Sequence, residues 1–235
     1  MRALTRLLGL VLVVPLVSAF SQDAGTQRTT YGSPGSSALL FSFSGLANLG
    51  ANAFDGGIGV KWYRSSPWAL RAGLQFALAS RDIPANPPPG GTGTDGSVSA
   101  WRLGAGGAAE YHLGTGRVSP FVGGGLGFSY TRTESKNAVT GGGAQTTIRN
   151  DINGETVNGQ TFEGGLAISL YGMAGVEYFV SDEVSLAAEY RLGVVSTSRF
   201  DDERVSGNTT ITTKSGSSLL FGISTGGALT LAVYF

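Results

Sequence analysis

The sequence predicts an all-β protein: one eight-stranded antiparallel up-and-down barrel preceded by a cleavable signal peptide. Three observations predict it. The 235 residues include 38 glycines, which excludes a mainly helical protein because each glycine inside a helix costs about 1 kcal/mol relative to alanine. Eight segments alternate apolar with small or polar residues at a period of two. Tight turns and long polar links alternate strictly between these segments, which is typical of an up-and-down barrel.

The N-terminus has the pattern of a secretory signal peptide. Arg2 and Arg6 form a positive n-region, and the apolar run LLGLVLVVPLV that follows is shorter than the ~20 residues that span a bilayer. Val17 and Ala19 occupy the small positions before a cleavage site. We predict cleavage after Ala19, with cleavage after Ala24 or an uncleaved anchor as alternatives. The expected parts are a signal peptide (1–19), a polar N-terminal leader (20–36) and an outer-membrane barrel domain (37–235).

The alternation is clearest between residues 68 and 80. Trp68, Leu70 and every second residue to Leu78 form an apolar face, whereas Arg71, Gln75 and small residues form the other. Only a strand places these two sets on opposite sides. The same alternation predicts seven further strands, at 38–45, 57–64, 98–113, 118–131, 165–180, 184–195 and 218–235.

The links between these strands are of two kinds. In an up-and-down barrel, tight turns lie at one rim and long loops at the other, so both ends of the barrel domain are expected at the tight-turn rim. Asn153–Gly154 predicts a turn in a hairpin that projects beyond the membrane. The tight links are near 66, at 114–117 and at 181–183, and the long ones are at about 47–56, 81–97, 132–163 and 199–216.

The apolar face suits lipid better than a barrel interior. It is continuous across the strands and rich in Leu, Val, Phe and Trp, whereas the other face is mostly Gly, Ala and Ser with a few charges. Eight strands of large side chains would overfill the lumen. Because a closed barrel satisfies its backbone groups without water, we predict that it spans a membrane. A soluble barrel of lipocalin type, with the faces reversed, is the alternative.

Aromatic residues lie near both ends of the predicted strands, on the apolar side. Such rings are typical of the interfacial girdles of membrane barrels. The predicted interfacial aromatics are Trp62, Trp68, Tyr111, Tyr178 and Phe235 near the tight turns, and Trp101, Phe128 and Tyr130 toward the long loops.

The signal peptide, eight alternating segments, three tight turns, four long loops and aromatic last residue resemble the small bacterial outer-membrane β-barrel family of OmpA/OmpX type, which includes opacity-like proteins. The resemblance implies the outer membrane of a Gram-negative-type bacterium, periplasmic N- and C-termini, and contact with lipid and lipopolysaccharide. It also implies that the outer-membrane assembly machinery recognises the last strand. Val233 and Phe235 match the end of that assembly signal, while Thr230 stands where glycine is usual.

Turning the apolar face outward sends seven charged residues into the lumen. An Arg or Lys facing lipid at the bilayer midplane would cost about 2–4 kcal/mol. Four of the seven lie at a similar depth, near the tight turns, and are expected to form a polar cluster. We interpret it as structural packing of a narrow interior, with a gate or narrow ion path as the alternative. The predicted lumen polar network is Lys61, Arg71, Arg102, Glu110, Glu177, Glu189 and Arg191.

The sequence offers little catalytic or cofactor chemistry. GTGTDG at 91–96 matches a dinucleotide-binding pattern but follows NPPP in a loop and opens no helix. There is no cysteine, and His112 is the only histidine, so a metal site is not expected. His112 also lies at the rim opposite the outer leaflet, which disfavours a lipid-modifying enzyme. DDER at 201–204 is interpreted as a solvated run, with a divalent cation among lipopolysaccharide phosphates as the alternative. We predict no catalytic, cofactor-binding or metal-binding residues.

Two classes of function remain. The first is a structural or surface-interaction barrel that serves membrane integrity, adhesion or antigenicity through the loops 81–97, 132–163 and 199–216. An exposed strand edge in these loops would pair with an extracellular protein. The second is a narrow channel or transporter for small solutes, which the charged lumen disfavours. The net charge is zero, so nucleic-acid binding is not indicated, and a monomer is expected.

Overall fold

The computed structural model describes residues 32–44 and 57–235. The predicted signal peptide (1–19), most of the predicted leader and the link at about 47–56 lie outside the described residues. Within the described part the chain is all-β, as predicted, and every paired strand is antiparallel to its neighbour. No helix in these ranges has the length and apolar character needed to cross a membrane.

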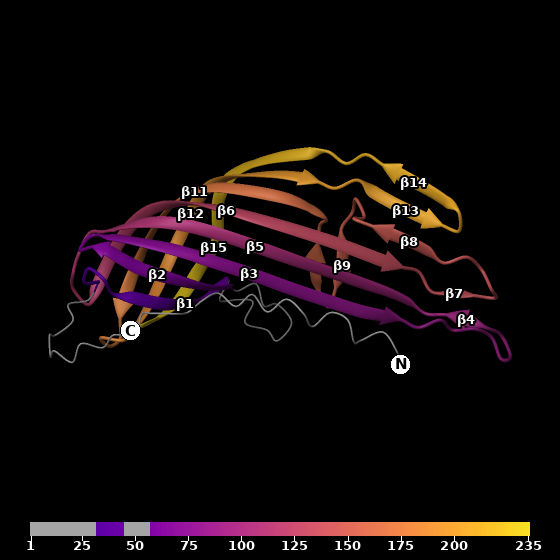
Figure 1. The fold of residues 1–235 in the computed structure, drawn as a ribbon, viewed down its shortest axis with the longest axis horizontal. Helices are drawn as coiled ribbons and strands as arrows, with labels where there is room; N and C mark the ends of the chain where they lie inside the picture. Colours follow the sequence, from indigo (N-terminus) through magenta and orange to yellow (C-terminus); the bar gives the residue numbers. More distant parts are fainter. Residues whose placement is uncertain (1–31, 45–56) are drawn as a thin grey trace.

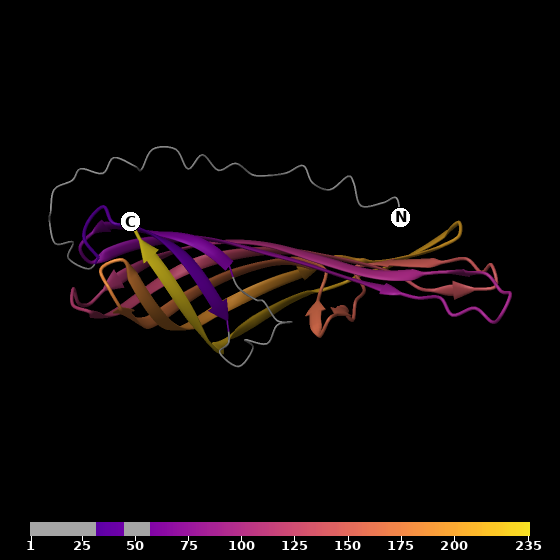
Figure 2. The same cartoon turned by 90° about the horizontal axis from the view of Figure 1, so that it is seen from below.

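Eight strands pair side by side in chain order, and the last pairs back with the first. Figure 2 shows these ribbons curving round a common interior. They are β1 (Ser37–Ser44), β2 (Gly57–Ser65), β3 (Trp68–Ile83), β5 (Gly96–His112), β6 (Val118–Lys136), β11 (Gly165–Phe179), β12 (Val184–Arg199) and β15 (Ser217–Tyr234).

The two ends of this barrel differ. The C-terminus and the tight turns lie at one end, and the longest strands run on toward the other (Figure 1). There β8 pairs with β6 and β13, and β13 pairs with β14, so the sheet continues beyond the ring. The short strands of the long loops are β4 (Gly93–Thr94), β7 (Val139–Thr140), β8 (Thr146–Arg149), β9 (Glu155–Val157), β10 (Gln160–Phe162), β13 (Asp202–Ser206) and β14 (Thr209–Thr213).

Side chains alternate between an exposed outer face and a buried inner face. On β3, Leu74, Phe76 and Leu78 are 50%, 64% and 66% exposed. On β2, Lys61 and Tyr63 are buried. Large apolar groups outside and charged groups inside are the reverse of what a water-soluble barrel shows.

Glycines on the inner face of β6 leave room for large residues of β11. A Cβ on Gly123 would lie 2.8 Å from Cε of Met173, and one on Gly125 would lie 2.6 Å from the hydroxyl of Tyr171. The run GGGLG at 123–127 therefore serves interior packing, as its small lumen-facing residues predict.

The prediction for the 132–163 loop is wrong about its hairpin. Asn153–Gly154 does form a turn, in which the Gly154 N–H donates to the Asp151 carbonyl at 2.9 Å. The hairpin, however, joins β9 to β10 and reverses at Asn158–Gly159, where φ is 51° and 81°. It also folds inward instead of projecting, because it carries two apolar side chains that the barrel interior shelters from water.

Candidate functional site

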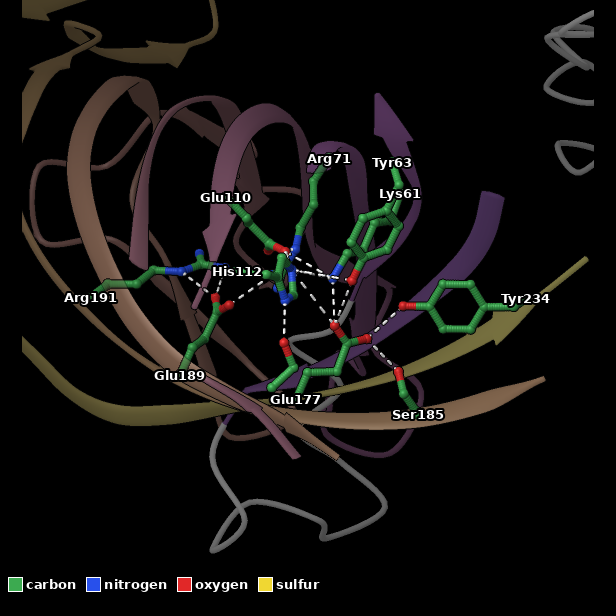
Figure 3. A network of polar contacts seen from close by, with 11 residues as sticks. Lys61, Tyr63, Arg71, Glu110, His112, Glu177, Ser185, Glu189, Arg191 and Tyr234 are labelled. Atoms are coloured by element: carbon green, nitrogen blue, oxygen red, sulfur yellow. Dashed lines mark hydrogen bonds and ion pairs between the residues drawn. The ribbon is translucent and has the colours of Figure 1, made fainter. Parts of the chain in front are cut away.

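Six charged residues form a series of ion pairs of alternating sign across the barrel interior (Figure 3). They come from five strands, and their side chains converge from different sides of the ring. We call this series the charge chain; in order of contact its members are Arg191 and Glu189 (β12), Arg71 (β3), Glu110 (β5), Lys61 (β2) and Glu177 (β11).

The links of the charge chain are short. Nη2 of Arg191 lies 2.5 Å from Oε1 of Glu189, and Nη1 of Arg71 lies 2.7 Å from Oε2 of the same carboxylate. Nε of Arg71 contacts Oε1 of Glu110. Nζ of Lys61 lies 2.8 Å from Oε2 of Glu110. Each charge in the interior of the series therefore has an opposite charge on both sides.

Burial makes this pairing necessary. The side chains of Lys61, Glu110 and Glu177 are at most 1% exposed, and an unpaired charge at such a site costs several kcal/mol. Lys61 and Arg71 are direct cross-strand partners, an arrangement in which like charges repel. Glu110 accepts contacts from both cations, and it thereby makes their proximity favourable.

Glu177 ends the chain in a cluster of hydroxyl groups. Its Oε2 is 2.6 Å from Nζ of Lys61 and accepts a hydrogen bond from Tyr63 at 3.2 Å. Its Oε1 accepts hydrogen bonds from Ser185 at 2.5 Å and from Tyr234 at 2.6 Å. Three hydroxyl donors and one ammonium thus satisfy a fully buried carboxylate.

His112 and Ser119 flank the chain beside Glu110. Nε2 of His112 lies 3.1 Å from Oε2 of Glu110. The Ser119 hydroxyl donates to the Gly114 carbonyl at 2.6 Å, so its oxygen accepts the hydrogen bond from Nδ1 of His112 at 2.8 Å. These are the residue types of a hydrolytic triad, but the adjoining cavity holds about 10 Å³, room for about one water molecule. The geometry supports packing and gives a nucleophile no room for substrate.

The structure brings together six of the seven predicted lumen residues and places Arg102 elsewhere. Arg102 precedes Glu110 by eight residues on β5, roughly 26 Å along a strand. Its Nε donates to Thr131 at 3.3 Å, and its guanidinium lies 5.3 Å from the centre of the Phe162 ring. The alternation of the sequence correctly placed Arg102 on the inner face of the barrel. It gave no information on how far along the barrel axis this residue lies.

Sequence reasoning missed the other members of this site, although a signal was present. Each shares the inward phase of a residue already placed in the lumen: Tyr63 follows Lys61 by two positions, and His112 follows Glu110 by two. Their identities as aromatic or small residues gave no reason to assign them to a polar network. The missed residues are Tyr63, His112, Ser119, Ser185 and Tyr234.

The hairpin β9–β10 packs against the inner face of β3, β5 and β6 toward the long loops. Val157 and Phe162 are 0% exposed and form a small apolar core with the inner face of β5 at Val98 and Ala100. Figure 2 shows the hairpin on the concave side of the sheet. This core and the charge chain lie at different heights along β5.

Hydrogen bonds from the end of β12 fix the base of the hairpin. Arg199 donates through Nη1 to the Ile152 carbonyl at 2.9 Å and through Nη2 to Glu163 at 2.6 Å. The Phe200 N–H donates to the Gly164 carbonyl at 3.2 Å. The segment is therefore held at both of its ends.

The predicted interfacial aromatics lie on the outer face. Within each of two pairs the rings are in contact. The ring centres of Trp68 and Tyr111 are 5.1 Å apart near the tight turns, and those of Trp101 and Tyr130 are 5.2 Å apart nearer the long loops. Six of the eight are exposed and two, Trp62 and Tyr130, are half-buried; the exposed ones are Trp68, Trp101, Tyr111, Phe128, Tyr178 and Phe235.

The acidic run at 201–204 is paired within the loops. Asp201 lies 2.7 Å from Lys214, Asp202 lies 3.1 Å from Arg204, and Glu203 lies 3.1 Å from Arg149. The hydrogen bond from Lys214 holds the pKa of Asp201 below its usual range. In residues 32–44 and 57–235 no group of three or more His, Cys, Asp or Glu side chains could hold a metal ion.

A family model described as outer membrane protein beta-barrel domain matches residues 9–215. The chain belongs to this family. The structure is also similar to the crystal structure of a major outer membrane protein from Thermus thermophilus, with 14% sequence identity and a TM-score of 0.42 over 86% of this chain and 98% of that chain. No curated protein matches the sequence at a significant level.

Proposed function

We propose that this outer-membrane protein is an eight-stranded transmembrane barrel of OmpA/OmpX type, made with a cleaved signal peptide, whose lumen is closed and whose role is structural or interactive at the cell surface. Lipid and lipopolysaccharide surround it, the chain ends are periplasmic, and the barrel is a monomer. The assembly machinery recognises its last strand, where Val233 and Phe235 point outward and Thr230 points inward. It is not an enzyme.

The observation that carries the proposal is the double closure of the interior. The charge chain fills the half near the tight turns, where Lys61, Glu110 and Glu177 exclude water. Near the long loops, the β9–β10 hairpin covers the inner face of β3, β5 and β6 with Val157 and Phe162. A conducting pore needs a continuous polar path, so two packed closures in series support a non-channel role.

The spacing of the aromatic pairs supports the membrane-spanning assignment. Tyr111 and Trp101 are ten residues apart on β5, roughly 33 Å along the strand. At a strand tilt of about 40° this corresponds to roughly 25 Å along the barrel axis, which is the height of the apolar band in outer-membrane barrels.

The sheet that continues past the ring supports the surface role. Its outermost strand, β14, has every residue exposed, and in the described part of the chain β13 is its single strand partner. The ion pairs of Glu134 and Glu203 with Arg149 stiffen the sheet beneath it. An ordered, exposed strand edge suits recognition of an extracellular protein by strand addition.

Planar-bilayer conductance of the refolded full chain tests the closed lumen. We expect no stable conductance steps from the wild type, and steps from a variant that lacks residues 155–162 and also carries Lys61→Met and Glu177→Met. Gel mobility before and after boiling provides the folding control, since folded membrane barrels migrate differently. Robust, solute-dependent conductance of the folded wild type would overturn the proposal in favour of a narrow channel.

A further inference from the structure

The two ends of the charge chain are not equivalent. Its three cations and three anions alternate, so the chain is neutral as a whole but has an anionic end and a cationic end. The anionic end, Glu177, is fully satisfied by Lys61 and three hydroxyl groups. The cationic end is Arg191.

Arg191 has donor capacity that the chain does not use. Its Nε and Nη2 both donate to the same oxygen of Glu189, at 2.8 and 2.5 Å. Nη1 has no hydrogen-bond partner among the residues that the structure describes. The guanidinium lies 4.7 Å from the centre of the Tyr171 ring, which fixes its plane, and the side chain is 41% exposed.

That exposed surface faces a cavity inside the barrel. The cavity holds about 360 Å³, within the range of small-molecule sites. Arg71 and Arg191 lie at its wall, and its other lining is glycine, alanine and larger apolar residues with a few neutral polar groups. Among the described residues, no carboxylate contributes to its lining. The polar residues of the lining are Gln75, Ser129, Ser169 and Tyr171.

We propose that this cavity binds a small organic anion, whose carboxylate occupies the free side of Arg191 and completes the alternation of charge. The carboxylate of the ligand accepts a hydrogen bond from Nη1 of Arg191. It is also attracted by the positive charge of Arg191, whose only counter-charge, Glu189, is shared with Arg71. The apolar part of the ligand lies against the glycine and alanine walls. Binding at this site does not require transport through the barrel, so the proposal holds whether or not the lumen conducts.

Calorimetric titration of the refolded full chain in a nonionic detergent tests the site. Benzoate is the probe, benzyl alcohol is the neutral ligand of similar shape, and inorganic phosphate is an anion without an apolar part. We expect saturable benzoate binding in the millimolar range or tighter, and at least tenfold weaker binding of both comparison ligands.

Two variants locate the binding. Arg191→Gln should weaken benzoate binding at least tenfold, while Arg81→Gln, the same change at an exposed position, should leave it unchanged. Ala167→Phe fills the cavity from its wall without altering any charge, and should also abolish binding. If Arg191→Gln does not show the gel shift of a folded barrel, Ala167→Phe still tests the site.

The inference fails on any of three results: no saturable benzoate binding, equal affinity for benzyl alcohol or phosphate, or benzoate binding that survives Ala167→Phe in a folded protein.

Discussion

The two closures of the barrel interior differ in how they are built. The charge chain draws its six members from five strands, so it exists only when the ring is closed. The hairpin β9–β10 is one continuous segment that rests two apolar side chains on the inner face of β5. The first closure is therefore coupled to folding of the whole barrel, and the second is a local element that can be lost alone. Four predictions test this difference.

Breaking the charge chain should have the largest effect. Glu177→Gln leaves Lys61 with a single counter-charge in a buried site, and loss of one partner of a buried pair costs about 3–5 kcal/mol. We expect this loss in the free energy of unfolding, measured by urea titration of the protein in lipid vesicles with tryptophan fluorescence. Glu183→Gln, in the exposed turn before β12, is the matched control. Unchanged unfolding of Glu177→Gln would show that the chain is not coupled to the fold.

Phe162→Ala should act on the hairpin alone. Truncating a buried phenylalanine costs about 3–5 kcal/mol. We expect this cost to lower the stability of the β9–β10 hairpin and not that of the barrel. We expect faster protease cleavage within residues 150–164 and an unchanged urea midpoint. Thr161→Ala, on the exposed side of the same strand, should change neither. A midpoint shift as large as that of Glu177→Gln would contradict the local character of this closure.

A side chain on an inner-face glycine should have an intermediate to small effect. In Gly125→Val the new Cβ would meet the Tyr171 hydroxyl and the Gly107 carbonyl, both at 2.6 Å, and such overpacking typically costs about 1–3 kcal/mol. Gly222→Val is the control, because a Cβ there meets nothing within 4 Å. Equal unfolding midpoints for the two variants would show that the interior has more free space than the structure gives it.

The smallest effect is expected in the exposed loops. Because Lys214 donates to Asp201 and lowers its pKa, any stability from this pair is present above the unfolded-state pKa of the carboxyl and is lost as the pH falls through the lower folded-state pKa. An NMR titration should find the pKa of Asp201 below the value of a free aspartate, and Lys214→Gln should raise it. An identical pKa in both proteins would contradict the ion pair.

The sequence predicted the strands and their faces because both follow from a period of two. Lys61, Arg71, Glu110 and Glu177 were also predicted to meet, since each lies a similar number of residues from a tight turn. The depth of Arg102 and the polar role of Tyr234 were not predictable in this way. They depend on strand length and on cross-strand register, such as the pairing of Tyr234 with Ala38, which a single segment does not encode.

The inward fold of the β9–β10 hairpin was missed for a related reason. Asn–Gly marks a turn at both 153–154 and 158–159, and local preference does not say which of the two reverses the strand. Val157 and Phe162 decide it, because only the later turn lets both side chains reach the inner face of β5. That choice is made by tertiary burial and not by the turn residues.

The central claim is that the apolar face meets lipid while the other face lines a closed interior. Ser169 and Leu170 are adjacent on β11, with Leu170 exposed outside and Ser169 at the wall of the interior cavity. The chain has no cysteine, so Leu170→Cys and Ser169→Cys can each carry one fluorescent label after refolding into vesicles. Brominated lipids should strongly quench the label at 170 and leave the label at 169 almost unaffected. Equal quenching at both positions, or stronger quenching at 169, would contradict the account.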